Sequence, residues 1–349
     1  ALGLAEPARA IGAAPGGPIA AAPAGQRRPD GRWLVRLPPA ATRTVAVVHR
    51  ADLHRMLLDA LAPGTVRTGA AVERVSGDGR TIEVAGTRLT VDVVVAADGI
   101  RSRIRAARPG DPGVRPAGYV AWRGVTDRPV DVGDGTGETV GRGLRFGIAP
   151  LADGRVYWFA VRSQPPGAPL AAGPDAVLDL FGAWHAPIAE LIDATPADRI
   201  QALPIEELAG PLPTFRHGRC VLLGDAAHAM TPNLGQGGNQ ALEDAATLVA
   251  LLAGTVGTDG GTHRADDVDA ALTTYDRLRR PRTRRVARQA RLLGRVLQAD
   301  GPVTSRLRDT ALRLTPPGAV ARGALAVQRW DTVSGDAVRP DGTTGAAGR

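Results

Sequence analysis

The sequence predicts an α/β fold into which an antiparallel lobe is inserted, followed by helices at the C-terminal end. Two apolar runs, at 91–97 and 220–223, are typical of buried parallel strands, and each leads into a turn that contains glycine and aspartate. Between them, residues 111–214 are rich in proline and glycine and contain short alternating segments, which favours antiparallel strands. Residues 266–327 show helical spacing interrupted by prolines instead.

The composition is that of a globular protein. The chain has 349 residues, of which 44% are hydrophobic, so it is long enough to bury a sizeable core. Its net charge of +8 would favour a polyanionic partner, but every basic residue is arginine and alanine, glycine and proline are heavily used. We attribute the charge to coding bias and expect no nucleic-acid partner. No apolar run is long enough to cross a membrane, so we expect no membrane association and a cytoplasmic location. A single cysteine, Cys220, excludes an internal disulfide, and its apolar neighbours predict burial.

The first 110 residues alternate between strand and helix patterns. The expected elements are a strand at 44–48, a helix from Asp52 to about Leu61, short strands at 72–75 and 81–84, and a fully buried strand at 91–97. Later in the chain, a buried strand at 220–223 precedes a glycine-rich loop and a helix at about 238–252. The two apolar runs predict that these parts of the chain share a parallel sheet.

The C-terminal segment predicts helices broken near Pro281, Pro302 and Pro316. Arginines are dense at 277–291, where Leu278, Val286, Leu292 and Leu293 have roughly helical spacing. We interpret these arginines as the solvated face of a packed helix. The last twenty residues are expected to be frayed.

The strongest functional pattern runs from Gly224 to Ala245 and reads GDAAHAMTPNLGQGGNQALEDA. The strand at 220–223 delivers Asp225 to its carboxyl end, where ligands of α/β sheets bind. Glycines in the loop let a ligand approach backbone N–H groups, and the start of the following helix favours a polar or anionic group. A mere tight connection, with Asp225 capping the next turn, is the structural alternative.

Two further patterns stand earlier in the chain. One is the stretch from Asp98 to Arg105, which reads DGIRSRIR, and the other runs from His49 to Arg55 and reads HRADLHR. Taken alone, the first is equally a plain Asp-Gly turn between a strand and a helix.

Together the three patterns resemble the flavin-binding motifs of the class A flavoprotein monooxygenases, the family of para-hydroxybenzoate, salicylate and urate hydroxylases. The resemblance implies a Rossmann-like FAD-binding domain of the para-hydroxybenzoate hydroxylase type with an antiparallel substrate domain. On this basis we expect an FAD-binding domain at 1–110 and 215–262, an antiparallel substrate-binding lobe at 111–214, C-terminal helices at 263–330 and a flexible tail at 331–349.

The resemblance also implies which residues bind the cofactor. The expected contacts to FAD come from Arg50, Val72, Asp98, Gly99, Arg105, Gly224, Asp225, Pro232, Gly235, Gly237, Gly238 and Asn239. Arg105 either anchors its turn or meets a phosphate of the nicotinamide cofactor, and Val72 either contacts adenine or packs in the core.

The family begins with a strand, a Gly-x-Gly-x-x-Gly turn and a helix that bind the ADP part of FAD. This sequence shows no such segment, because Gly12 to Gly17 lie in an Ala/Pro-rich stretch with no preceding apolar strand. We therefore expect an N-terminally truncated domain lacking roughly 40 to 60 residues, the size of one βαβ unit, and weak FAD retention.

The lobe carries most of the scarce aromatic residues, at 119–124 and 156–159. They suit a flat aromatic substrate and equally suit an ordinary core. If residue 145 pairs opposite residue 157, Arg145 and Tyr157 point to one face. In the urate hydroxylases an Arg and a Tyr at matching positions grip the substrate, so the resemblance suggests this pair. The alternative is a surface arginine beside a packed tyrosine.

The resemblance implies an FAD-dependent monooxygenase that uses NAD(P)H and O2 to hydroxylate an aromatic or heteroaromatic small molecule through a flavin C4a-hydroperoxide. A homodimer is possible, and no metal site is expected. Alternatives are an epoxidase or hydroxylase of an alkene or polyketide, and a catalytically silent fragment. Ser102 and His228 lack the surroundings of a nucleophile elbow, so a hydrolase is not expected.

Overall fold

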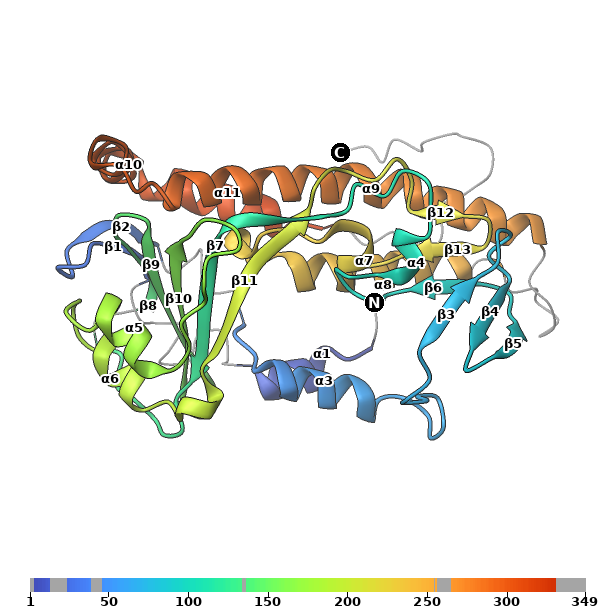
Figure 1. The fold of residues 1–349 in the computed structure, drawn as a ribbon, viewed down its shortest axis with the longest axis horizontal. Helices are drawn as coiled ribbons and strands as arrows, with labels where there is room; N and C mark the ends of the chain where they lie inside the picture. The colour runs from blue at the N-terminus through green and yellow to red at the C-terminus, as the bar shows by residue number, and fades with distance from the viewer. Residues whose placement is uncertain are drawn as a thin grey trace, which may run out of the picture.

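The computed structural model of the chain describes residues 3–12, 24–38, 46–133, 136–253, 255 and 265–330. Two bodies of packed elements lie side by side in Figure 1, and one long helix, α9 (Ala265–Leu297), runs along both of them. The expected tail at 331–349 lies outside the described residues. The expected strand at 44–48 is not formed at 46–48, and residues 44 and 45 are outside the described part.

The larger body is built on a seven-stranded sheet. Its strands lie in the order β11 (Gln201–Leu208), β7 (Val114–Val125), β10 (Val156–Ser163), β9 (Leu144–Pro150), β8 (Thr136–Val140), β1 (Ala24–Arg27) and β2 (Trp33–Leu37). Neighbouring strands are antiparallel except β1 and β8, so the structure has the antiparallel sheet predicted for 111–214. However, β1 and β2 also belong to it, although we assigned that segment to the FAD-binding part. The membership of these strands is hard to predict from the sequence for two reasons. The strands are short, and β1 pairs with β8, which lies more than a hundred residues away in the chain.

One face of this sheet packs against α5 (Pro174–Phe181) and α6 (Ile188–Asp193). Trp122 and Trp158 are fully buried there, and Trp158 stacks on Phe146 with ring centroids 5.4 Å apart. Because side chains alternate along a strand, Tyr157 and Phe159 point to the opposite face, which α5 and α6 leave uncovered (Figure 1). The aromatic residues therefore lie on both faces of the sheet, and on the second face Phe159 packs against the buried residues Tyr119, Ala121, Val161 and Ile205.

The smaller body contains a three-stranded sheet of β12 (Arg216–His217), β13 (Cys220–Leu222) and β6 (Val94–Ala96). β6 and β13 are parallel, as predicted, and Cys220 is fully buried. The prediction that 91–97 is fully buried is wrong, because Val95 is 44% exposed. Within the described residues β6 pairs only with β13, so it forms an edge of this sheet. A separate meander of β3 (Val72–Val75), β4 (Thr81–Val84) and β5 (Thr87–Thr90) follows α3 (Arg50–Asp59).

The helices follow most of the predicted boundaries. α8 (Gly237–Ala253), α10 (Pro302–Leu314) and α11 (Pro317–Gln328) lie close to where the sequence indicated them, and α1 (Ala5–Ile11) packs on α3. The predicted break at Pro281 is wrong, since α9 continues through it. Pro281 lies on an exposed side of α9, where water can bond the carbonyl that lacks its helical donor. No helix among the described residues is long and apolar enough to cross a membrane.

The predicted apolar face of α9 is also only partly correct. Leu278 and Leu292 are 39% and 63% exposed, whereas Val286 is buried. The buried face instead includes Thr283, whose hydroxyl donates to the carbonyl of Arg279 within α9, and Arg279, whose side chain makes polar contacts to α8. The packing of α9 is therefore decided partly by ion pairs that its own sequence does not reveal.

Candidate functional site

The glycine-rich loop leads directly into the start of α8. Gly235 ends the short 3-10 turn η3 (Pro232–Leu234) with φ of 62°, a left-handed conformation that suits glycine. The first helical hydrogen bond joins the N–H of Gln240 to the carbonyl of Gln236 at 2.8 Å, so the N–H groups of residues 237–239 have no acceptor within the helix. With no side chains at 237 and 238, this helix start can receive a polar or anionic group directly on the backbone.

Asp225 opens the short helix α7 (Asp225–His228), immediately after β13 and Gly224. Its side chain is exposed and makes no cap or other hydrogen bond to the described residues. A Cβ placed on Gly237 would lie 3.9 Å from a carboxylate oxygen of Asp225. The carboxylate therefore faces the start of α8, and the alternative that it caps α7 finds no support.

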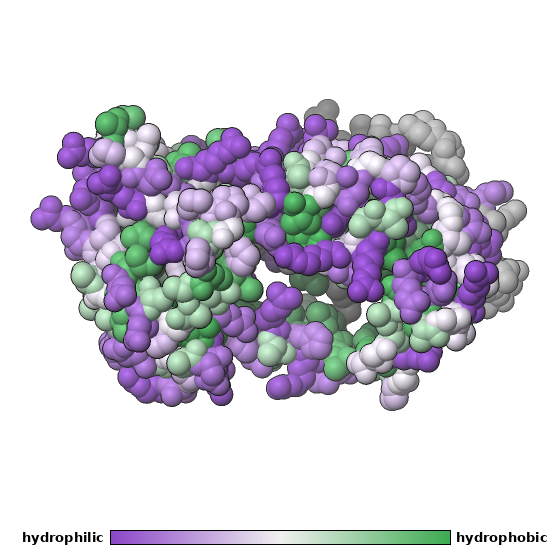
Figure 2. Space-filling view, in the orientation of Figure 1, coloured by the Kyte–Doolittle hydropathy of each residue, from purple (hydrophilic) through white to green (hydrophobic). Residues whose placement is uncertain are grey.

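A cavity of about 960 Å³ adjoins this loop. Leu234, Gly235, Gln236 and Asn239 line one side of it, and residues of α1 and α3 line the other. Its size is at the upper end of the range of small-molecule and cofactor pockets, roughly 300–1,000 Å³. Figure 2 shows that the molecule is hollowed in the middle of this face.

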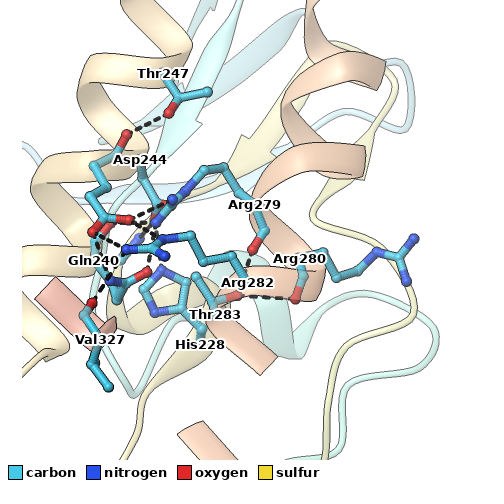
Figure 3. Close-up of polar contacts among 11 residues, drawn as sticks. His228, Gln240, Asp244, Thr247, Arg279, Arg280, Arg282, Thr283 and Val327 are labelled. Atoms are coloured by element: carbon cyan, nitrogen blue, oxygen red, sulfur yellow. Dashed lines mark hydrogen bonds and ion pairs between the residues drawn. The ribbon is translucent and has the colours of Figure 1, made fainter. Parts of the chain in front are cut away.

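The motif is held in place by a buried polar cluster between α8 and α9 (Figure 3). Asp244 accepts hydrogen bonds from Gly224 N–H at 3.0 Å and from His228 Nε2 at 2.6 Å, and its other oxygen accepts from Arg279 at 2.6 Å. Glu243 forms ion pairs with Arg279 at 2.7 Å and with Arg282 at 2.6 Å. These contacts fix the end of β13, and with it Asp225, relative to α8.

The pKa of Asp244 results from opposing effects. Burial raises it, but the hydrogen bond and charge of His228 and the charge of Arg279 outweigh burial, so the pKa lies below its ordinary value. Asp244 is therefore a carboxylate that holds its partners by charge-assisted hydrogen bonds.

The second pattern forms a turn and the short helix α4 (Arg103–Ala106). The Asp98 carboxylate accepts the N–H of Arg103 at 3.0 Å, and Gly99 has φ of 81°. Arg105 is buried, pairs with Asp111 at 2.9 Å, and donates to the carbonyls of Ile100 at 2.7 Å and Ala226 at 3.2 Å. Of the two roles expected for Arg105, the geometry favours anchoring, because it ties this turn to the motif at 224–245.

The remaining expected cofactor residues lie apart from the cavity. Arg50 is the exposed first residue of α3, and Val72, the first residue of β3, packs against the core of the smaller body. Pro232 opens η3. Of the expected cofactor residues, Gly235 and Asn239 line the cavity. The others are not among its lining residues: Gly224, Asp225, Pro232, Gly237 and Gly238 belong to the adjoining motif, and Arg50, Val72, Asp98, Gly99 and Arg105 lie elsewhere.

The expected pairing of residue 145 with residue 157 is wrong. Arg145 pairs with Val161, and Tyr157 pairs with Ala149. Because the shift is an even number of residues, both side chains still lie on the same face, but they are four residues, or roughly 13 Å, apart along the strands.

Arg145 is only 2% exposed, and protein groups surround its guanidinium. It donates to Glu138 at 3.0 Å, to Gln298 at 2.6 Å and to Asn233 at 2.8 Å. Asn233 in turn donates to the Tyr119 hydroxyl and, at 3.1 Å, to the carbonyl of Ala290 in α9. A Cβ on Gly294 would lie 2.2 Å from the Asn233 amide, so α9 approaches this loop as closely as glycine allows. Arg145 therefore joins the sheet, η3 and the end of α9, which is at odds with a guanidinium free to grip substrate.

The same face of the sheet, which α5 and α6 do not cover, offers another arginine. Tyr157 and Phe159 are half-buried, with ring centroids 6.3 Å apart, and Phe159 lies over Gly147. Arg123 pairs opposite Phe159 and is the diagonal neighbour of Tyr157. It is half-buried and makes no hydrogen bond or ion pair with the described residues. Burial raises the pKa of the Tyr157 hydroxyl and the charge of Arg123 opposes this, so Tyr157 stays protonated at neutral pH.

Sequence reasoning missed the positioning residues Arg279 and Asn233. The sequence does hold an indirect sign of Arg279. The motif contains two adjacent carboxylates, Glu243 and Asp244, which need cationic partners if α8 is buried. Arg279 lies 35 residues beyond Asp244, so only the fold identifies it as that partner.

Known proteins are similar to this chain. The family described as "FAD binding domain" matches residues 34–290. Aurachin C monooxygenase/isomerase of Stigmatella aurantiaca is 36% identical over 274 residues, covering 76% of this chain and 68% of the relative. A 3-amino-4-hydroxybenzoate 2-monooxygenase of Streptomyces platensis is 38% identical over 281 residues, covering 76% of this chain and 67% of the relative.

Solved structures agree. Klebsiella pneumoniae HpxO complexed with FAD and uric acid superposes with a TM-score of 0.78 at 28% identity, covering 92% of this chain and 82% of that one. A salicylate hydroxylase substrate complex gives a TM-score of 0.71 at 25% identity, covering 92% of this chain and 86% of that one. The site geometry fits FAD as well, because the start of α8 and the unpartnered Asp225 offer donors and an acceptor to a polar ligand. The chain therefore belongs to the FAD-binding-domain family and is a class A flavoprotein monooxygenase with FAD as its cofactor.

Proposed function

We propose that this monooxygenase uses NAD(P)H and O2 to hydroxylate a small aromatic or heteroaromatic molecule that carries a negative charge. The observation that carries the proposal is the sheet face opposite α5 and α6, where Arg123 lies beside Tyr157 and Phe159 and makes no hydrogen bond or ion pair with the described residues. Aromatic walls suit a flat ring, and a guanidinium without a protein partner suits its anionic group. Two of the similar proteins support the same class of substrate. One is named as a monooxygenase of 3-amino-4-hydroxybenzoate, and the other was solved in complex with uric acid.

The residues around the cavity would hold the cofactor. Asp225 would accept hydrogen bonds from the ribityl hydroxyls, and the N–H groups at the start of α8 would donate to the polar edge of the flavin. The chemistry that bound FAD would supply is acceptance of a hydride from NAD(P)H and activation of O2 for transfer to the substrate ring. The protein's own contribution is to orient the ring on the sheet face and to exclude water from it.

The substrate face can be tested with FAD-supplemented protein and a series of hydroxybenzoates, each compared with its uncharged amide. We expect substrate-dependent NAD(P)H oxidation with a product 16 mass units heavier. Arg123→Gln should raise KM for the acids by roughly 10-fold or more, as expected for loss of a charged hydrogen bond, and leave KM for the amides unchanged. Arg199→Gln, which removes an exposed arginine just before β11, is the matched control.

Two results would count against the proposal. Equal KM changes for acids and amides would show that Arg123 does not contact the anionic group. If the enzyme converts alkenes to epoxides and hydroxylates none of the aromatic acids, its substrate is an alkene rather than an aromatic molecule.

A further inference from the structure

We propose that the chain carries a second ligand site, behind the motif at 224–245, for a small aromatic carboxylate. The site is a pocket between α7, α9 and the segment that follows β11, and it shares no lining residue with the cavity at the glycine loop. It is therefore separate from the place proposed for the flavin, and it is independent of the substrate proposed above.

The inner wall of this pocket is apolar. Leu208, Leu212, Phe215, Ala227 and Ala287 line it, and its volume is about 130 Å³. A protein cavity of ~150 Å³ with apolar walls holds a benzene ring, so a single ring fits here. A nicotinamide dinucleotide or a flavin is far too large.

The mouth of the pocket is strongly cationic. Arg280, Arg284, Arg288 and Arg291 follow one another along one side of α9, and no acidic residue lines the pocket. Arg280 pairs with Asp276 at 3.3 Å and Arg291 with Glu207 at 2.8 Å. Arg284 and Arg288, in contrast, make no hydrogen bond or ion pair with the described residues and are exposed. Two uncompensated guanidinium groups at the rim of an apolar pocket match a carboxylate attached to a ring.

A buried atom beside the pocket points to a ligand independently. The His228 side chain is 4% exposed, lines the pocket, and uses Nε2 to bond Asp244. Its Nδ1 is buried without a hydrogen-bond partner among the described residues. Because the Asp244 carboxylate only accepts, Nε2 carries a proton, and Nδ1 is the ring nitrogen left without a partner. A hydroxyl on the ligand's ring would supply the missing partner, because a hydroxyl can both donate and accept a hydrogen bond.

The pocket can be probed by calorimetric titration of the full chain with benzoate, its three hydroxy isomers, benzyl alcohol and inorganic phosphate. We expect benzoate to bind, benzyl alcohol and phosphate to bind at least tenfold more weakly, and one hydroxy isomer to bind several-fold more tightly than benzoate. Binding of phosphate as tight as that of benzoate would overturn the apolar part of the site, and absence of benzoate binding at 10 mM would overturn the site altogether.

Variants separate this pocket from the flavin and substrate sites. Arg284→Gln with Arg288→Gln should weaken benzoate binding by roughly 10-fold or more, since charged hydrogen bonds are lost. Ala287→Leu should weaken it equally by filling the pocket. The control pair, Arg277→Gln with Arg306→Gln, removes two exposed charges away from the pocket and should change nothing. If both test variants bind benzoate like the control, the ligand sits elsewhere and the second site does not exist.

Discussion

Asp225 is exposed, has no hydrogen-bond or ion-pair partner in the described part of the chain, and faces the start of α8, so the folded chain itself gains little from its carboxylate. Asp225→Ala should therefore weaken FAD binding by roughly 10- to 150-fold, the cost of one charged hydrogen bond to a ligand, and leave the melting temperature of the FAD-free protein unchanged. Titration of flavin fluorescence and calorimetry of the FAD-free protein measure the two quantities. Asp193→Ala, at the exposed end of α6, controls for loss of a surface carboxylate. A dissociation constant within twofold of the original would remove Asp225 from the flavin site.

Arg145, in contrast to Asp225, contributes to the stability of the fold. Its guanidinium is buried and donates hydrogen bonds to Glu138, Gln298 and Asn233. Arg145→Ala leaves these acceptors without their donor and should lower the free energy of unfolding by about 3–5 kcal/mol, as for a broken buried pair. Urea denaturation compares this loss with that of Arg123→Gln, which should be under ~0.5 kcal/mol. A stable Arg145→Ala variant with a raised KM would instead restore Arg145 as a substrate contact.

At the scale of elements, α8 and α9 are joined through Asp244, which also holds the end of β13. Because the folded-state pKa of Asp244 is lowered, its ionised form is favoured by folding, and this stabilisation is present above the unfolded pKa of about 3.9. It is lost as the pH falls through the lower folded value. The difference in free energy of unfolding between the original chain and Asp244→Asn should therefore shrink below about pH 4. Urea denaturation from pH 3 to 7 checks this, and a difference that stays constant or grows in acid contradicts it.

At the scale of the whole molecule, three elements run through both bodies. β7 and β11 carry Val114 and Leu208 into the core of the smaller body and Val120 and Ala202 into the core of the larger one. α9 extends from Leu272, in the core of the smaller body, to Leu297, which packs with Leu34 of β2 in the larger body. Shared elements couple the two cores, so we expect them to unfold together.

The distribution of tryptophan makes this testable. Four of the five tryptophans lie in the larger body, at positions 33, 122, 158 and 184, and none lies in the core of the smaller one. Tryptophan fluorescence thus reports the larger body, while far-UV circular dichroism reports both. We expect coincident thermal transitions that FAD shifts upward together. Separate midpoints, or a fluorescence transition insensitive to FAD, would show that the bodies unfold independently.

Much of this protein could be predicted from local pattern. Short-range periodicity and turn chemistry predict the antiparallel lobe, α8 and the motif from Gly224 to Ala245. They also predict the parallel strands at 94–96 and 220–222. Those signals are local because alternation, helical spacing and glycine turns are each decided within a few residues. They were enough to predict the flavoprotein family and FAD, which the comparisons confirm.

Only the tertiary structure decided which charged side chains act together. The register of β9 and β10 moved Arg145 away from Tyr157, and the packing of α9 against α8 gave Asp244 its partner Arg279. The pairing of β7 with β10 placed Arg123 beside Phe159 and Tyr157, where it makes no hydrogen bond or ion pair with the described residues. A strand's alternation specifies the face of each side chain but not the partner along the neighbouring strand, and an ion pair depends on two segments far apart in the chain meeting in space. For that reason the sequence determined the fold and the cofactor, whereas the division of its arginines between structure and ligand binding depended on long-range packing.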